Sequence, residues 1–115
     1  GEGNLGQEPK IHRSGGAEND EGTVCNMSIY FDYPVPKKEG GFEDKGGFWM
    51  DVEVWDKRAV ACHALLNKGD RVIVQGSIIG KPWTDDQDKQ RVKLVVRAKR
   101  ISTDLLMIHA SESVE

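Results

Sequence analysis

Four segments rich in Val, Ile, Tyr, Phe or Trp recur along this sequence, at residues 23–33, 47–55, 70–80 and 91–101. Such composition is typical of β-strands. The segments between them are polar and contain glycine or proline, as expected of loops, at residues 12–22, 34–46 and 84–90. A chain of 115 residues is long enough for one domain of ordinary size. The pattern therefore predicts a small, mostly β domain.

One segment, residues 57–67, has helical rather than strand periodicity. Its apolar residues at helical spacing are Val60, Ala64 and Leu65, and Ala59, Cys62 and Leu66 widen the stripe. Asp56 is a suitable N-cap, and Gly69 can adopt the left-handed conformation that ends a helix. A single helix inserted among strands joined by long polar loops favours a Greek-key barrel.

Several classes of protein are excluded by composition. No apolar run approaches the roughly 20 residues of a membrane helix. Cys25 and Cys62 are the only cysteines and form no CxxC pair, so we expect neither a disulfide scaffold nor a zinc site. The three histidines have no carboxylate or cysteine at motif spacing, and the acidic loop 84–90 lacks the Gly and Glu of a calcium loop. We therefore expect no enzyme, no metal site and no cofactor.

The charge of the chain is unevenly distributed. The net charge is −3, but residues 1–56 contain 5 Lys or Arg against 12 Asp or Glu, whereas residues 57–115 contain 11 against 7. A basic surface can exist on such an acidic protein, because the local field matters more than the total charge. The acidic first half either repels nucleic acid or forms the far side of the barrel.

Strand 47–55 is expected to have two unlike faces, because side chains alternate along a strand. The expected interior face carries Phe48, Met50, Val52 and Val54. The opposite face carries Trp49, Asp51, Glu53 and Trp55, with its two indoles about 20 Å apart. These rings are either packed under a loop or a subunit contact, or exposed as platforms on which bases stack regardless of their identity.

The last strand places four cations on one face. Arg91, Lys93, Arg97 and Lys99 alternate along residues 91–101, with Val95 between them. Such a row suits phosphates, although basic residues also occur on solvated strands and guard exposed edges. Cations for the backbone and rings for the bases are the two ingredients of single-strand binding. Together the two strands therefore indicate a protein that binds single-stranded nucleic acid.

Two further aromatic residues extend this candidate surface. Trp83 stands beside Lys81 at the start of the third loop, where the alternative is a ring packed on its own hairpin. Tyr30 falls on the polar face of strand 23–33. The expected buried face of that strand carries Cys25, Met27, Ile29 and Phe31.

These segments together resemble the bacterial single-stranded DNA-binding protein family. GNLGQEP at residues 3–9 is similar to the turn after the family's first strand, residues 47–78 to its central strand, helix and fourth strand, and KPWTDDQDKQR at 81–91 to its final hairpin. The resemblance implies a five-stranded Greek-key OB-fold barrel with one helix between strands 3 and 4 and a truncated first strand. It places the domain at residues 1–103 and a C-terminal tail, without the family's acidic tip, at 104–115.

The resemblance also implies a binding site. Trp49, Trp55 and Trp83 fall where the family stacks aromatic residues on bases, and Lys57, Lys81 and Arg91 fall where it carries backbone contacts. The family's further tryptophan after its second strand has no counterpart in DYPVP at residues 32–36, where Tyr33 is the substitute and Val35 stands nearest the expected position.

The predicted function is sequence-tolerant binding of single-stranded DNA in replication, recombination or repair. The predicted nucleic-acid-binding residues are Trp49, Trp55, Trp83, Tyr30, Tyr33, Lys57, Lys81, Arg91, Lys93, Arg97 and Lys99. By resemblance, the protein is a homo-dimer or homo-tetramer at the nucleoid in a bacterial cytoplasm, with replication or recombination proteins as partners and no membrane. The alternatives are a primosome-type or plasmid-borne conjugation protein, an OB module that binds proteins, and an RNA-binding OB domain.

Overall fold

A computed structural model describes residues 1–13, 20–36 and 42–106, and only the backbone of segments 33–36 and 42–45. Its elements are β1 (Glu2–Leu5), β2 (Lys10–His12), β3 (Val24–Pro36), β4 (Phe42–Trp55), α1 (Lys57–Leu65), β5 (Arg71–Thr84) and β6 (Gln90–Ser102). Among the described residues, no helix is long and apolar enough to cross a membrane.

Five strands close a ring in the order β1, β5, β6, β4, β3 and back to β1. The neighbours are antiparallel except β4 and β6, which run parallel. β1 closes the ring by pairing with β3 on one edge and β5 on the other, and β2 adds a sixth strand beside β3. The predicted barrel with a helix between its third and fourth strands is thus confirmed. Residues 3–5, expected in a turn, lie instead in β1.

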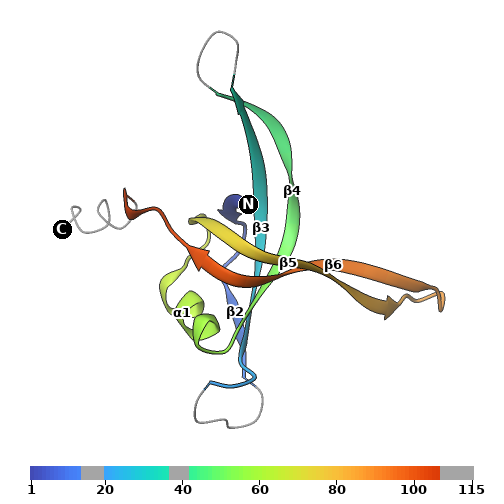
Figure 1. Ribbon diagram of the computed structural model, residues 1–115. Coiled ribbons are helices and arrows are strands. Elements are labelled where there is room, and N and C mark those ends of the chain that lie inside the picture. The colour runs from blue at the N-terminus through green and yellow to red at the C-terminus, as the bar shows by residue number, and fades with distance from the viewer. Residues whose placement is uncertain (14–19, 37–41, 107–115) are drawn as a thin grey trace.

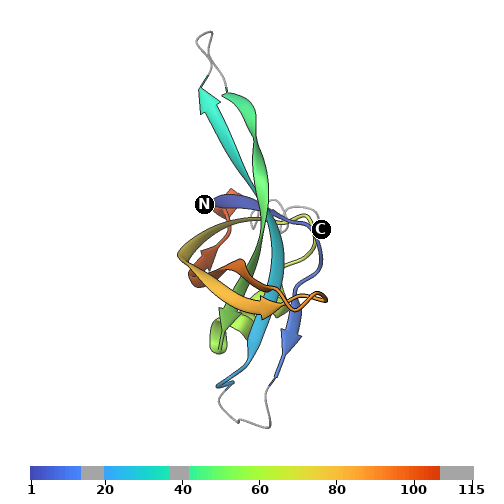
Figure 2. The same cartoon turned by 90° about the vertical axis from the view of Figure 1, so that its right-hand side faces the viewer.

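The strands continue beyond the ring as two hairpin arms, one formed by β3 and β4 and the other by β5 and β6 (Figures 1 and 2). The prediction that residues 34–46 form a loop is wrong at both ends, because Pro34 pairs with Asp44 and Pro36 with Phe42. Proline is tolerated in this arm because a two-stranded hairpin leaves one edge of each strand without a ladder partner. The third loop is likewise shorter than predicted, and β5 extends to Thr84.

The core lies inside the ring and under α1, which packs against β2, β3 and β4 at one end (Figure 1). The core residues are Leu5, Cys25, Met27, Ile29, Phe31, Val52, Val54, Ala59, Cys62, Leu66, Val72 and Val74. The predicted alternation of faces is therefore confirmed for β3 and for the second half of β4. Phe48, expected inside, is 38% exposed and stacks on Phe31 at the edge of the core.

The helix differs from its prediction in three respects. Its buried residues are Ala59 and Cys62, whereas the predicted Leu65 is exposed. The side of α1 that faces the core is therefore next to the predicted one. Asp56 is the N-cap, but its carboxylate accepts a hydrogen bond from the Gly22 N–H instead of capping the first turn. Gly69 has a positive φ, as expected, but lies in the turn before β5, after the helix has ended.

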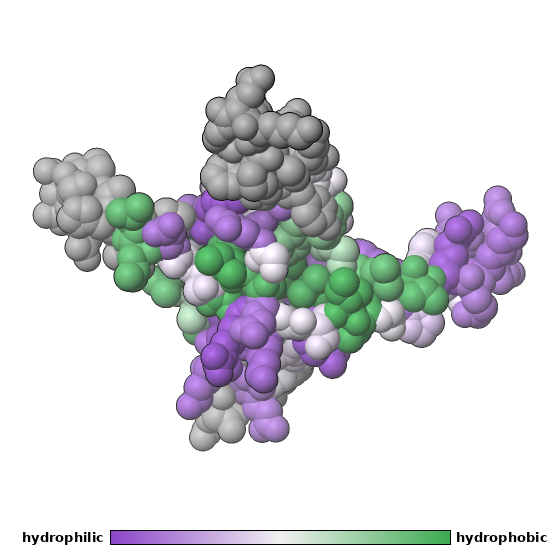
Figure 3. Space-filling model, turned by 45° about the horizontal axis from the view of Figure 1, so that its top comes forward, coloured by the Kyte–Doolittle hydropathy of each residue, from purple (hydrophilic) through white to green (hydrophobic). Residues whose placement is uncertain are grey.

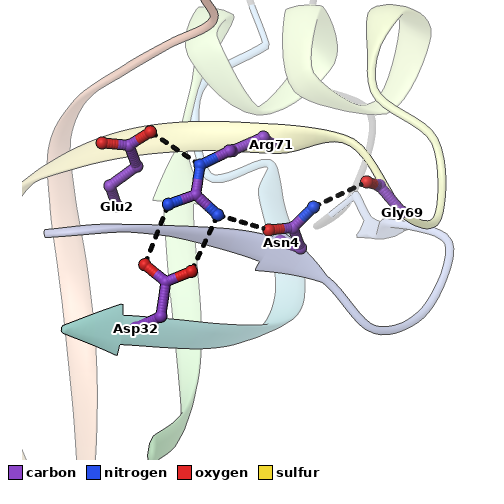
Figure 4. A network of polar contacts seen from close by, with 5 residues as sticks. All are labelled: Glu2, Asn4, Asp32, Gly69 and Arg71. Carbon is purple, nitrogen blue, oxygen red and sulfur yellow. Dashed lines mark hydrogen bonds and ion pairs between the residues drawn. The ribbon is translucent and has the colours of Figure 1, made fainter. Parts of the chain in front are cut away.

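A polar network fastens the ring where β1 joins β3 and β5 (Figure 4). The Arg71 guanidinium donates to both oxygens of Asp32, at 2.8 and 2.9 Å, and also to Glu2 and Asn4. The Asn4 side chain donates in turn to the Gly69 carbonyl. The hydrogen bonds and charge of Arg71 outweigh desolvation and hold the pKa of Asp32 below its ordinary value. Arg71, which lies in β5, therefore bonds to both β1 and β3 and links all three strands where the ring closes.

Candidate nucleic-acid interface

The register of the sheet brings the predicted aromatic and basic residues onto one outward face. Residues directly opposite one another in neighbouring strands share a face. The opposed pairs on this face are Tyr30 with Trp49, Asp51 with Val95, Glu53 with Arg97, Lys81 with Lys93, and Trp83 with Arg91. The face thus runs from β3 across β4 and β6 to β5. The three indoles are 59%, 39% and 49% exposed at Trp49, Trp55 and Trp83.

Trp49 is held at one end of this face by two contacts. Its ring lies 5.3 Å from that of Tyr30, between centroids, with the planes tilted by 56°. On another side it passes close over Gly6, where a Cβ atom would lie only 2.4 Å from the indole. The ring is therefore oriented by its neighbours while remaining more than half exposed.

Trp55 is fixed by a carboxylate that is almost completely covered. The Glu53 side chain is only 3% exposed, although it points to the outward face. It accepts hydrogen bonds from the Trp55 Nε1–H at 3.2 Å, from Arg97 at 3.0 Å and from Lys81 at 2.5 Å. The Arg97 guanidinium also lies 6.0 Å from the centroid of the Trp55 ring, within the range of a cation–π contact.

The environment of Glu53 stabilises its charged form. Burial by itself raises the pKa of this carboxyl group. Hydrogen bonds from Lys81, Trp55 and Arg97, with the charge of Lys81, outweigh burial and hold the pKa below its ordinary value. Glu53 is therefore an anion that anchors one aromatic ring and two cations from three strands.

Two further cations on the face, Lys93 and Arg91, also have carboxylate partners. Lys93 pairs with Asp51 across the β4–β6 junction. Arg91 pairs with Asp85, whose carboxylate additionally accepts backbone hydrogen bonds from the hairpin turn. The hydrogen bond from Arg91 and those from the turn outweigh desolvation and lower the pKa of Asp85. The acidic first half of the chain thus contributes Asp51 and Glu53 to this face, while Glu2 lies on β1, across the ring from it.

The row of cations on β6 is interrupted near its end. A register shift between Gln75 and Gly76 leaves Lys99 unopposed, and Arg100 faces Gln75. Lys99 and Arg100 are both exposed, so Arg100 joins the basic surface although strand alternation excluded it. The sequence signal that could have indicated this bulge is Gly76, an isolated glycine inside the strand and next to the register shift.

Lys57 lies away from the sheet, at the start of α1. A shallow hollow beside it is lined by Trp55, Lys57, Arg58, Glu21 and Asp56. Arg58 is an exposed cation next to Trp55 that the sequence analysis missed. Its position directly after the predicted Lys57 is the signal that could have identified it.

The remaining predictions concern Tyr33 and the absence of catalysis. Tyr33 lies in β3 at a register shift, and its side chain is outside the part of the chain that the structure describes. Within that part, no three His, Cys, Asp or Glu side chains gather as a metal site would require. Burial raises the pKa of both thiols, that of Cys62 to about 11, so neither is activated as a nucleophile.

Comparison with known proteins agrees with this architecture. The model of the single-strand binding protein family matches residues 2–104. A small single-stranded DNA-binding protein from Streptomyces coelicolor is similar in structure, with a TM-score of 0.70, 19% identity and 92% of each chain covered. A Plasmodium falciparum SSB complex with single-stranded DNA has a TM-score of 0.65 and 22% identity, covering 88% of this chain and 86% of that one.

A deletion mutant of the single-stranded DNA-binding protein from Thermus aquaticus is also similar, with a TM-score of 0.65 and 20% identity. The match covers 88% of this chain and 46% of that one. At these identities the structural likenesses show the fold, and the OB fold expected from the sequence is confirmed.

Proposed function

Since the chain belongs to the single-strand binding protein family, we propose that it binds single-stranded DNA with little sequence preference on the outward face of β3, β4, β6 and β5. One observation carries this proposal: three indoles between 39% and 59% exposed share a face with a row of cations. Exposed rings offer stacking surfaces to any base, and cations attract the backbone.

The proposed mechanism has two components. Bases stack on Trp49, Trp55 and Trp83, with Tyr30 and Tyr33 as further contacts, and each stacked base contributes about 1–3 kcal/mol. Phosphates bind along the basic residues and release counterions, which makes the affinity depend on salt by about 0.7 per phosphate in the logarithmic slope. The proposed phosphate contacts are Lys57, Lys81, Arg91, Lys93, Arg97 and Lys99.

The biological setting is part of the same proposal. The protein protects exposed strands during replication, recombination or repair in a bacterial cytoplasm, at the nucleoid, as a non-enzymatic homo-dimer or homo-tetramer with replication or recombination proteins as partners. Residues 1–103 form the binding domain and 104–115 the tail. Support for self-association comes from the apolar side of the β5–β6 arm, where Ile78, Val92 and Leu94 are exposed up to a hydrophilic tip (Figure 3).

The exposed indoles also support a second candidate function, an OB module that binds another protein. In that case the tryptophans are buried by a protein partner and not by bases. The two functions differ in what quenches the tryptophan fluorescence, which makes them separable in one assay.

The experiment is a titration with oligo(dT), followed by tryptophan fluorescence at two salt concentrations. We expect strong quenching, an affinity that falls steeply with salt, and losses of about 5- to 150-fold for Trp49→Ala, Trp55→Ala or Trp83→Ala. Leu65→Ala is the control, because Leu65 is an exposed apolar residue on α1, outside the face. Duplex DNA and single-stranded RNA serve as competitors, and tighter RNA binding would favour the RNA-binding alternative. Fluorescence that saturating oligonucleotide leaves unchanged would contradict the proposal and favour the protein-binding module.

A further inference from the structure

Three carboxylates share the proposed binding face with the cations. Glu53 holds Lys81 and Arg97, Asp51 holds Lys93, and Asp85 holds Arg91. In the described part of the chain, the two other proposed phosphate contacts, Lys57 and Lys99, have no carboxylate partner. A phosphate that approaches one of the paired cations therefore meets a competing anion that belongs to the protein.

The structure separates these carboxylates by how firmly each is held. Glu53 is 3% exposed and has three donors. The Asp85 side chain is 14% exposed and also accepts from the Gln87 and Lys89 N–H groups, so its release would disrupt the hairpin turn. Asp51 is different: its side chain is 45% exposed, and Lys93 is its one partner in the described part of the chain. Asp51 is therefore the carboxylate that can most easily dissociate from its cation, Lys93.

Asp51 also occupies the central position on the face. It lies two residues after Trp49 and four before Trp55, on the same side of β4. In the parallel pairing of β4 with β6, Asp51 stands opposite Val95. Val95 is buried but does not belong to the main core cluster. A DNA strand whose bases stack on both indoles has its backbone cross this region, so the negative charge of Asp51 faces the incoming phosphates.

Resting on the proposed function, we propose that Asp51 is an internal competitor for phosphate. In the free protein it occupies the ammonium group of Lys93, and single-stranded DNA exchanges a phosphate for this carboxylate when it binds. The exchange limits the affinity in two ways. It removes the Lys93–Asp51 contact, and it leaves a carboxylate close to the phosphates.

Substitution of Asp51 is therefore expected to strengthen binding. Exposed ion pairs of this kind change equilibria by about 1.5- to 5-fold, and we expect Asp51→Asn to tighten oligo(dT) binding by that factor. Lys93 contacts a phosphate in both complexes, but in the variant no Asp51 carboxylate repels the strand, so we expect the logarithmic salt slope to steepen by at most about 0.7, the value for one phosphate. The gain shrinks as salt rises, because the repulsion by Asp51 and the attraction by Lys93 are both screened.

The matched control is Glu2→Gln, which also removes one carboxylate from an exposed ion pair. Glu2 lies on β1, between β5 and β3, across the ring from the β4–β6 junction, and its partner Arg71 keeps Asp32. We expect Glu2→Gln to leave the affinity within about 1.5-fold of the original. An equal gain in both variants would show that total charge, rather than Asp51, sets the affinity, and would overturn the inference.

A double-mutant cycle with Lys93→Gln tests the partner directly. Lys93→Gln is expected to cost little affinity while Asp51 is present and about 1.5- to 5-fold more in the Asp51→Asn background. Equal costs in both backgrounds, or an Asp51→Asn variant that binds no tighter, would overturn the inference while the proposed function stands. An original protein that binds no oligo(dT) would overturn both. Urea denaturation of each variant verifies that the compared proteins are folded.

Discussion

Glu53→Gln is the substitution that most directly tests how the outward face is organised. Gln preserves the shape of the side chain but removes the charge that Lys81 and Arg97 share. It retains one oxygen acceptor, which can serve only part of the three donors that now converge on the carboxylate. The substitution thus separates the charge of Glu53 from the space that it fills.

The expected loss of stability follows from the exposure of the partners. A hydrogen bond to a charged group contributes about 1.5–3 kcal/mol when it is well shielded from water. Lys81 and Arg97 are 47% and 54% exposed, so water can solvate both cations once the carboxylate is gone. We therefore expect Glu53→Gln to lower the free energy of unfolding by about 1–2 kcal/mol, and Tm by about 5–10 °C.

The pH dependence of this loss provides the decisive assay. In the unfolded chain Glu53 titrates near a pKa of about 4.3, and its pKa in the folded protein is lower. Its stabilising contribution is thus fully present above the unfolded pKa and is lost as the pH falls through the folded pKa. Urea denaturation should show the full difference between the original protein and Glu53→Gln at pH 7, and a smaller difference near pH 3. A difference that is absent at pH 7, or that does not shrink on acidification, would refute this account of Glu53.

Two further substitutions test the geometry around the face and the closure of the ring. Gly6→Ala would place a methyl group 2.4 Å from the Trp49 indole, so the ring must move. Because that ring is expected to stack on a base, the variant should stay folded but bind oligo(dT) about 5-fold or more weakly. An unchanged titration would mean that the position of the ring is unimportant. Arg71→Lys should lower the free energy of unfolding, measured in urea, by about 1–2 kcal/mol. The reason is that an ammonium group cannot bind both oxygens of Asp32 and also reach Glu2. An equally stable variant would show that the network contributes little to the closure of the ring.

The sequence predicted the fold and the faces of the strands because both depend on local pattern. Alternation alone assigns Val52 and Val54 to the core and Trp49 and Trp55 to the outward face, and the exposed fractions agree. The same rule fails where the chain departs from regular pairing. At the bulge opposite Gln75, the register shift turns Arg100 outward, and nothing in the local spacing of the cations reveals it.

The burial of Glu53 could not be predicted in the same way. Its carboxylate is covered by side chains from β5 and β6 that lie 28 and 44 residues away in the sequence. Which of these long side chains reaches Glu53 depends on the register between distant strands, and no property of the segment 47–55 determines it. The length of the two hairpin arms was underestimated for a related reason. Strands that pair outside the ring do not need a buried apolar face, so no apolar alternation in the sequence indicates them.

The distribution of charge explains how an acidic chain can present a surface for a polyanion. β4 comes from the acidic first half of the sequence and β6 from the basic second half, and their parallel pairing places Asp51 and Glu53 directly beside the cations. Each carboxylate cancels the long-range field of the cations that it pairs with and occupies some of their hydrogen-bond donors, which a phosphate can take over only at contact distance. The face can then bind isolated anions weakly and still bind firmly a strand that brings stacked bases and phosphates at the same time. Net charge is consequently a poor guide to the ligand of this protein, whereas the pairing of individual cations on the face determines what a phosphate must displace.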